Sequence, residues 1–194
     1  MKNNYYNRKE QIVHTALHII SEKGMKKLTM KNIASEIGFT DAALYRHFSS
    51  KRDILKELIE VASTNLINKV NTVVAKTDDP VDKLHEILRI HLAHMEQHKG
   101  MSRIIFSEEV HQNDAELRGL LFRTINHYLD LVRGILLRAK VSGAVRADID
   151  IDATAVAFFG LIQSVTFLWS LSDYAYSIHQ KADDLFVVFS RGLH

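Results

Sequence analysis

The chain has 194 residues, of which 46% are hydrophobic and 25% charged, and its formal net charge is +2. This composition is typical of a globular protein and excludes the disordered, collagen-like and proline-rich classes. The absence of cysteine excludes disulfides, thiolate metal sites and a cysteine nucleophile, and it favours a reducing compartment. The first ten residues are polar and lack the apolar stretch of a secretory signal, so we expect a cytoplasmic protein.

Positive charge is concentrated in the first third of the chain. Residues 1–56 contain 11 Lys+Arg and 5 Asp+Glu, a net charge of +6, whereas residues 57–194 contain 14 and 18, a net charge of −4. A basic segment on an otherwise acidic chain suggests a polyanionic partner for that segment. A solvated basic surface without a partner would have the same composition.

Apolar residues recur at helical spacing along almost the whole chain, and no segment shows the alternation of a strand. The first pattern stops at Gly24. Thr29 can cap the second helix, which ends at Gly38, and Thr40 can cap a third. Ser50 and Asp53 form a capping box that opens the next helix. The later helices are expected over residues 51–75, 80–99, 102–111, 115–141, 151–172 and 183–193. The sequence therefore predicts an all-α fold of about nine helices.

The segment from Thr29 to Phe48 has the pattern of a helix-turn-helix. Such a motif needs a small residue where the two helices approach and a glycine where the turn takes unusual dihedral angles, and Ala34 and Gly38 provide both. The N-terminal part of the second helix is then exposed, and in proteins of this design it enters the major groove of DNA. An ordinary helical hairpin is the alternative, but the basic charge around the motif favours DNA binding.

The same segment resembles the DNA-binding module of the TetR/AcrR family of one-component transcriptional regulators. The resemblance covers roughly the first third of the chain, and the residues that carry it are Gly24, Gly38 and those at 28–30, 33–34 and 39–55. Ala42 and Ala43 stand where the family pattern often has Gly and Ser or Thr. Ala43 therefore lacks the hydroxyl that would make one of the usual DNA contacts. Arg52 stands where an acidic residue is common.

The resemblance and the chemistry of the side chains together assign the DNA-contacting residues. They are Thr29, Thr40, Asp41, Ala42, Ala43, Tyr45, Arg46, His47 and Lys51. Tyr45, His47 and Lys51 are expected at phosphates, although Tyr45 could instead pack in the core and Lys51 could be a plain surface charge. Arg46 is expected to read a base, because arginine can pair with guanine O6 and N7 in bidentate fashion; a phosphate or solvent-facing arginine is the alternative.

The resemblance divides the chain into a DNA-binding module, residues 1–50, and a helical effector-binding and dimerisation domain, residues 51–194. Residues 153–172 contain no charge and are long enough to cross a membrane. The preceding Asp148, Asp150 and Asp152 and the lack of basic flanks favour a helix buried in a bundle, so we expect no membrane contact. Together with the last helix it is expected to form a four-helix homodimer interface, with intramolecular core as the alternative.

A ligand-responsive regulator needs a concave and mostly apolar cavity for its small-molecule effector. Candidates to line it are Phe106, Phe122, His127, Tyr128, Gln163, Phe167 and Trp169. Each of these side chains could equally be plain core, but as a set they favour an apolar or aromatic effector. No cofactor is expected, and no catalytic set at persuasive spacing indicates an enzyme.

Three histidines, His91, His94 and His98, lie at i, i+3 and i+7 and so share one face of the helix expected over residues 80–99. They could bind zinc or nickel with His111 or His127 completing the shell, or they could form a pH-sensitive patch. Histidines without a metal are the simpler interpretation, and we predict no metal site.

The preferred interpretation is an all-α homodimer that represses transcription by binding palindromic operator DNA and is released by a small molecule. A metal- or pH-responsive regulator that uses the three histidines is the first alternative. An enzyme that has kept a helical module similar to a DNA-binding one is the second.

Overall fold

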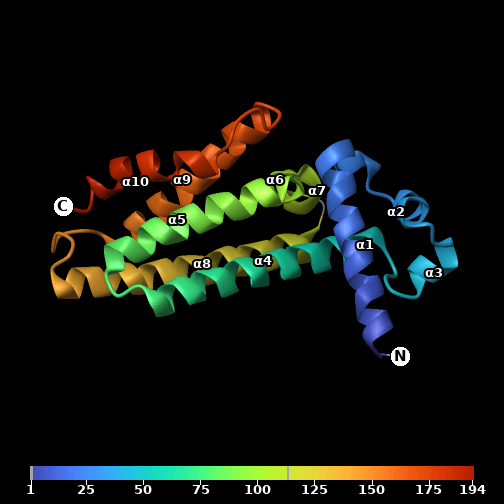
Figure 1. The fold of residues 1–194 in the computed structure, drawn as a ribbon, viewed down its shortest axis with the longest axis horizontal. Coiled ribbons are helices and arrows are strands. Elements are labelled where there is room, and N and C mark those ends of the chain that lie inside the picture. Colours follow the sequence, from blue (N-terminus) through green and yellow to red (C-terminus); the bar gives the residue numbers. More distant parts are fainter. Residues whose placement is uncertain (1, 113) are drawn as a thin grey trace. The chain divides into compact units, whose positions relative to one another are not determined.

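The computed structural model describes residues 2–112 and 114–194. Within these ranges the regular secondary structure consists of helices only (Figure 1). It has ten α-helices and two short 3₁₀ turns in the described part of the chain. They are α1 (Lys2–Lys23), η1 (Met25–Lys27), α2 (Met30–Ile37), α3 (Asp41–Tyr45), α4 (Lys51–Lys76), α5 (Pro80–Gln97), α6 (Lys99–Ile105), α7 (Glu108–His111), α8 (Ala115–Ser142), α9 (Ile151–Leu171), η2 (His179–Lys181) and α10 (Ala182–Ser190). The predicted all-α class is confirmed.

One predicted helix is divided in the structure. The pattern over residues 102–111 suggested a single helix, but the chain breaks at Phe106 and Ser107 into α6 and α7. The reason is local, because the Ser107 hydroxyl accepts a hydrogen bond from the Val110 amide at 3.3 Å and so caps a new helix. The helix expected to reach residue 99 ends earlier, at Gln97, and His98 is the N-cap residue of α6.

The chain folds into two compact units, each built from two segments. Unit 1 comprises the described residues up to Ser63 together with those of His98–Leu121, and unit 2 comprises Thr64–Gln97 and Phe122–His194. Helices α4 and α8 each begin in unit 1 and continue into unit 2. The expected functional division after residue 50 stays a prediction.

In unit 1, α1 packs closely against α6. A Cβ atom added at Gly100 of α6 would lie 2.8 Å from Leu17 Cδ1, 2.8 Å from Ser21 Oγ and 2.9 Å from the Leu17 carbonyl oxygen. Only glycine fits so close to another helix without a shift of the backbone. The buried side chains Ile12 and Ile33 belong to the apolar core of this unit, which also holds α2.

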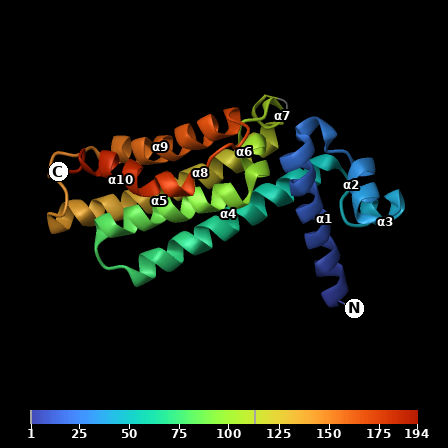
Figure 2. The ribbon, with the colours of Figure 1, turned by 45° about the horizontal axis from the view of Figure 1, so that its top comes forward.

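In unit 2, α5, α8, α9 and α10 form a helical bundle with the second half of α4, and both views show α5 between α4 and α10 (Figures 1 and 2). Aromatic rings join the helices: Tyr128 of α8 lies against Phe159 of α9, and Phe158 of α9 lies edge-on to Phe189 of α10. Glu96 of α5 accepts hydrogen bonds from the Ser177 hydroxyl at 3.0 Å and the His179 amide at 2.9 Å. These bonds hold the connection between α9 and α10 on α5.

Helix α9 has one covered and one exposed face. By length and composition it is the one helix in the described ranges that could cross a membrane. Phe158, Ile162 and Trp169 are buried within unit 2. The large apolar side chains exposed on α9 and on α10 are Val156, Phe167, Leu168, Leu171, Val187 and Val188. This is the surface that the sequence predicted to pair with a second subunit.

Candidate functional site

The turn between α2 and α3 has the geometry of a helix-turn-helix. Gly38 ends α2 in the left-handed conformation, with φ 76° and ψ 29°, and the Phe39 amide donates to the Ala34 carbonyl at 2.8 Å. Thr29 Oγ1 accepts from the Asn32 amide at 3.1 Å at the start of α2, and Thr40 Oγ1 accepts from the Ala43 amide at 3.2 Å at the start of α3. Both threonines therefore cap helices, as predicted.

Helix α3 is anchored by a single fully buried side chain, Leu44. Its other predicted DNA contacts lie outside the core: Thr40, Asp41, Ala42, Tyr45 and Arg46 are exposed, and Ala43 is half-buried. Tyr45 is 53% exposed, which rules out the alternative that it packs in the core. A short helix with one anchored side and several exposed side chains leaves its N-terminal part accessible to a groove of DNA.

Positive charge surrounds the half-buried His47. Burial lowers the pKa of this imidazole below its ordinary value, and the charges of Lys9, Arg46 and Arg8 lower it further. His47 is therefore neutral at pH 7 and would meet a phosphate as a neutral hydrogen-bond donor. The same three cations raise the electrostatic potential at this face, which favours an approaching polyanion.

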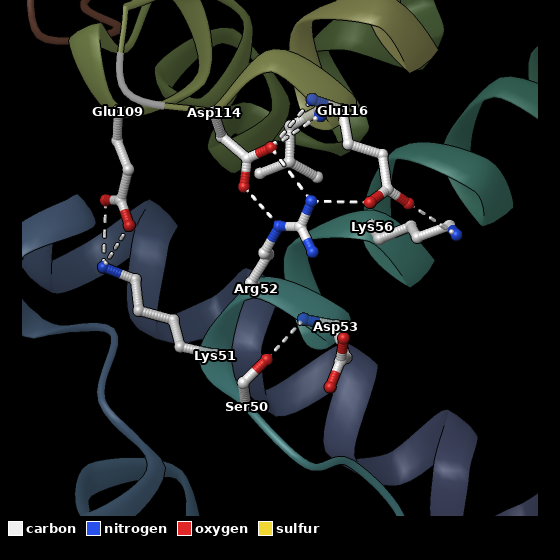
Figure 3. Close-up of polar contacts among 9 residues, drawn as sticks. Ser50, Lys51, Arg52, Asp53, Lys56, Glu109, Asp114 and Glu116 are labelled. Atoms are coloured by element: carbon white, nitrogen blue, oxygen red, sulfur yellow. Dashed lines mark hydrogen bonds and ion pairs between the residues drawn. The ribbon is translucent and has the colours of Figure 1, made fainter.

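Lys51 lies at the start of α4, which Ser50 caps by accepting the Asp53 amide at 3.2 Å. The Lys51 Nζ lies 2.9 Å from both carboxylate oxygens of Glu109 on α7 (Figure 3). The next residue, Arg52, donates to both Asp114 and Glu116, and Glu116 also accepts from Lys56 at 3.0 Å. The start of α4 is thus joined to α7 and to the start of α8 by ion pairs.

These acidic partners were not found from the sequence. Glu109, Asp114 and Glu116 are 58 to 64 residues from the cations they bind, and no local pattern links residues so far apart. The pKa values of the Asp114 and Glu116 carboxyls are lowered, chiefly by hydrogen bonds from Arg52 and Lys56 respectively. Asp114 and Glu116 therefore carry their charge at neutral pH.

The predicted effector residues differ in their burial and in the unit to which they belong. Tyr128 and Trp169 are buried in unit 2, Gln163 is half-buried, and Phe122, His127 and Phe167 are exposed. Phe106 is exposed and belongs to unit 1. The Trp169 indole Nε1 donates to the Tyr176 carbonyl at 2.6 Å, so its polar atom is already engaged. The assignment of this set to an effector stays a prediction.

The three histidines differ in their surroundings. His91 and His94 are buried on α5, whereas His98 lies beyond the end of that helix, half-buried at the N-cap of α6. The spacing argument fails because α5 ends at Gln97. In the described part of the chain, no group of three His, Cys, Asp or Glu residues is placed to hold a metal ion.

His91 is also unsuited to sensing physiological pH. Its Nδ1 lies 3.1 Å from the Tyr128 hydroxyl, and complete burial lowers the pKa of the imidazole to about 3, with a smaller effect of His94. Burial raises the pKa of the Tyr128 hydroxyl, so both partners are neutral.

Thr166 of α9 was not predicted as a functional residue. It is fully buried, and its hydroxyl has no hydrogen-bond partner among the described residues.

The fold and the exposed α3 define a helix-turn-helix DNA-binding protein with a second helical unit. Residues 12–58 match the family described as bacterial regulatory proteins, tetR family, and residues 60–192 match the C-terminal region of YsiA-like proteins. The chain therefore belongs to the TetR family of transcriptional regulators. This is a family of soluble, non-enzymatic DNA-binding regulators, as the sequence predicted.

Similar proteins align over nearly the whole chain. The fatty acid metabolism regulator of Bacillus subtilis is 23% identical over 184 residues, which cover 95% of this chain and 94% of that protein. The nucleoid occlusion factor SlmA of Vibrio vulnificus is 24% identical over 185 residues, 95% and 94% of the two chains. Among solved structures, the fatty acid degradation regulator FadR of Bacillus halodurans has a TM-score of 0.85 at 22% identity, covering 96% of each chain. FadR of Bacillus subtilis in complex with stearoyl-CoA has a TM-score of 0.83 at 23% identity, covering 95% and 99%.

Proposed function

We propose that this chain is a cytoplasmic homodimeric repressor that binds palindromic operator DNA and is released by an apolar effector. The observation that carries the proposal is the exposed N-terminal part of α3, held on the core by Leu44 within a basic segment of the chain. Residues 1–50 would bind DNA, and residues 51–194 would bind the effector and form the dimer.

At the DNA, Tyr45, His47 and Lys51 would contact phosphates and Arg46 would read a guanine. Thr29 and Thr40 use their hydroxyls as helix caps, so each would approach a phosphate mainly through the amides of the helix that it opens. Along α3, Asp41, Ala42 and Ala43 would face base edges. The methyl group of Ala42 suits contact with the methyl group of thymine.

The effector would be a long-chain acyl thioester. This assignment is supported by the FadR relative, which was solved in complex with stearoyl-CoA, and by the residues inside unit 2. An acyl chain needs apolar surroundings with a few polar groups that orient its head. The buried Tyr128 and Trp169 would supply apolar surface, and the Thr166 hydroxyl would supply a hydrogen-bonding group that has no partner in the described chain.

The effector would act by shifting a population between two arrangements of the dimer. In one arrangement the two copies of α3 match successive major grooves, and in the other they do not. A ligand that binds the second arrangement more tightly lowers operator affinity by the ratio of its two affinities. Because α4 is one continuous helix that belongs to both units, it would carry this change along the chain.

The test begins with selection of an operator from random DNA by the purified full chain. Binding is then measured by fluorescence anisotropy with stearoyl-CoA, with free CoA and with stearate. We expect selection of a palindrome and its release by stearoyl-CoA but not by CoA alone. Selection of DNA without two related half-sites would contradict the dimeric repressor. A palindrome released by none of the three compounds would contradict only the effector class.

Phe167→Ala tests the effector residues within the same assay. If Phe167 contacts the effector, the variant should bind the operator normally and respond less to stearoyl-CoA. If this half-exposed ring instead belongs to the dimer interface, operator binding should weaken before any ligand is added. Leu137→Ala, at an exposed position on α8, is the matched control and should change neither property.

A further inference from the structure

The ion pair between Lys51 and Glu109 occupies the atom through which Lys51 would bind DNA. Both carboxylate oxygens of Glu109 lie 2.9 Å from the Lys51 Nζ. A phosphate oxygen would have to approach the same ammonium group, since Lys51 has no other charged atom. The inference drawn from this contact rests on the proposed role of Lys51 at a phosphate.

We propose that Glu109 is an internal competitor for the phosphate of the operator, so that α7 lowers the affinity of the protein for DNA. In the free protein the carboxylate of Glu109 stands where a phosphate oxygen would stand in the complex. Binding of DNA exchanges one anion for the other at Lys51, and the Glu109 charge is left near the DNA backbone. Both the lost ion pair and the remaining negative charge act against binding.

The position of Glu109 is set by the packing of α7. This helix has only four residues, but Val110 is fully buried and Ser107 caps it through the Val110 amide at 3.3 Å. The preceding Glu108 is exposed, and Glu109 is turned toward the start of α4 (Figure 3). The carboxylate that meets Lys51 is therefore presented by an anchored turn rather than by a free side chain.

The neighbouring cation, Arg52, is held more firmly than Lys51. Arg52 donates to two carboxylates, Asp114 and Glu116 (Figure 3). Asp114 in turn accepts the Glu116 and Leu117 amides, each at 3.0 Å, and so caps α8. Removing Arg52 from this group would break several hydrogen bonds at once. Lys51 has one ion-pair partner in the described chain and is the cation that can exchange it for a phosphate.

The experiment compares the operator affinity of Glu109→Gln with that of Glu108→Gln in the full chain. Both variants remove one negative charge from the same turn, but only the first releases Lys51. A partly exposed ion pair contributes up to about 1 kcal/mol, which corresponds to a gain in affinity of up to about fivefold per subunit for Glu109→Gln. The gain should shrink as salt is added, because salt screens the competing charge. Equal affinities of the two variants would overturn the proposal.

Lys51→Ala and the double variant Lys51→Ala/Glu109→Gln complete a cycle. Lys51→Ala should weaken binding and lower the slope of log affinity against log salt by about one unit per subunit. In its background the gain from Glu109→Gln should shrink, because only the repulsion between the Glu109 charge and the DNA is then removed, and a gain as large as in the unmodified chain would contradict competition for Lys51. If Lys51→Ala leaves affinity and slope unchanged, the proposed phosphate contact itself is wrong. If it weakens binding while Glu109→Gln does not strengthen it, only the competition is wrong.

Thermal unfolding of each variant separates these effects from loss of folding. Glu109→Ala serves as a second variant that also releases Lys51 without introducing an amide that can bind it. Both Glu109 variants should have melting temperatures within a few degrees of that of the unmodified chain, and both should bind the operator more tightly. A rise in affinity with glutamine but not with alanine would show a new contact of the amide and overturn the proposal.

Discussion

Arg46 and Lys51 illustrate how two basic residues five positions apart serve different purposes. Arg46 is exposed at the C-cap of α3. The N–H groups of its planar guanidinium are arranged to donate two hydrogen bonds to the edge of a DNA base. Lys51 opens the next helix and has a compact charge that suits a phosphate or a carboxylate. The first would determine which DNA is bound, and the second would determine how tightly any DNA is bound.

Arg46→Ala tests this distinction. The variant should lose about 1–3 kcal/mol of binding free energy on the selected operator and relax the preference at one base pair per half-site. Binding to random DNA should change less. The measurement is a titration of the operator, of its single-base variants and of random DNA by anisotropy. Equal losses on operator and random DNA would reassign Arg46 to a phosphate.

His91 is a buried histidine that is neutral in the folded chain. Its pKa is about 3 in the folded state, against about 6.5 in an unfolded peptide. Below pH 6.5 the unfolded chain takes up a proton at this position and the folded chain does not. Stability is therefore lost as the pH falls from 6.5 toward 3.

His91→Gln should remove this loss and keep a polar partner for the Tyr128 hydroxyl. Between pH 7.5 and 5.5 the unmodified chain should lose about 1.4 kcal/mol of unfolding free energy from His91, and the variant should not. The check is urea denaturation at both pH values. His127→Gln, at an exposed position on α8, is the control and should follow the unmodified chain. Identical pH dependence of the His91→Gln variant and the unmodified chain would show that folding does not lower the pKa of His91.

At the scale of elements, two glycines position the helices around the candidate site for different reasons. Gly38 allows the left-handed end of α2, while a Cβ at that position would meet no atom within 4 Å. Gly100 has an ordinary helical backbone, but a Cβ there would collide with the Leu17 carbonyl of α1. The first glycine is required by backbone conformation, and the second by the close approach of two helices.

Alanine substitutions should separate the two requirements. Gly38→Ala should cost about 1–2 kcal/mol of unfolding free energy through the backbone conformation alone, and Gly38→Asn should cost less. Gly100→Ala should cost about 1–3 kcal/mol of unfolding free energy through overpacking, and Gly100→Asn should cost at least as much. Gly134→Ala on α8 is the control, because its Cβ meets only Arg138 at 3.8 Å; it should be neutral or slightly stabilising. Chemical denaturation measures all five variants, and a neutral Gly100→Ala would contradict the close packing of α1 on α6.

At the scale of the whole molecule, the apolar surface of α9 and α10 has no cover within the described chain. Leu168 and Leu171 on α9 and Val188 on α10 are each more than half exposed. An apolar surface of this kind on two neighbouring helices is typical of a protein interface. A homodimer would cover it and would place two copies of α3 on the two halves of a palindrome.

Leu171→Glu should disrupt that dimer, because it would bury a charge at the interface. We expect sedimentation equilibrium to show dimers of the unmodified chain and monomers of the variant, with a large loss of operator affinity. Val141→Glu adds the same charge at an exposed position on α8 and should remain dimeric. Dimeric Leu171→Glu would place the interface elsewhere, and dissociation of both variants would indicate a general effect of charge.

Local signals in the sequence determined most of the helices and the DNA-binding motif. Thr29, Gly38 and Thr40 act within a few residues of themselves, so their roles as caps and turn could be predicted without a fold. The break at Ser107 was missed because the hydrophobic pattern continues through it, although a capping hydroxyl was present. His98 was placed on the wrong helix for a related reason, since helical spacing says nothing about where a helix ends.

The meeting of distant side chains and the covering of helix faces depend instead on how the helices pack. The pairing of Lys51 with Glu109 and of Arg52 with Asp114 depends on the packing of α7 and α8 beside the start of α4, and charges of either sign occur throughout the sequence. The burial of His91 and the exposure of Phe167 likewise follow from the neighbours of each helix. An apolar residue has the same sequence signature whether it faces a core, an effector or a second subunit, because burial of apolar surface is not directional.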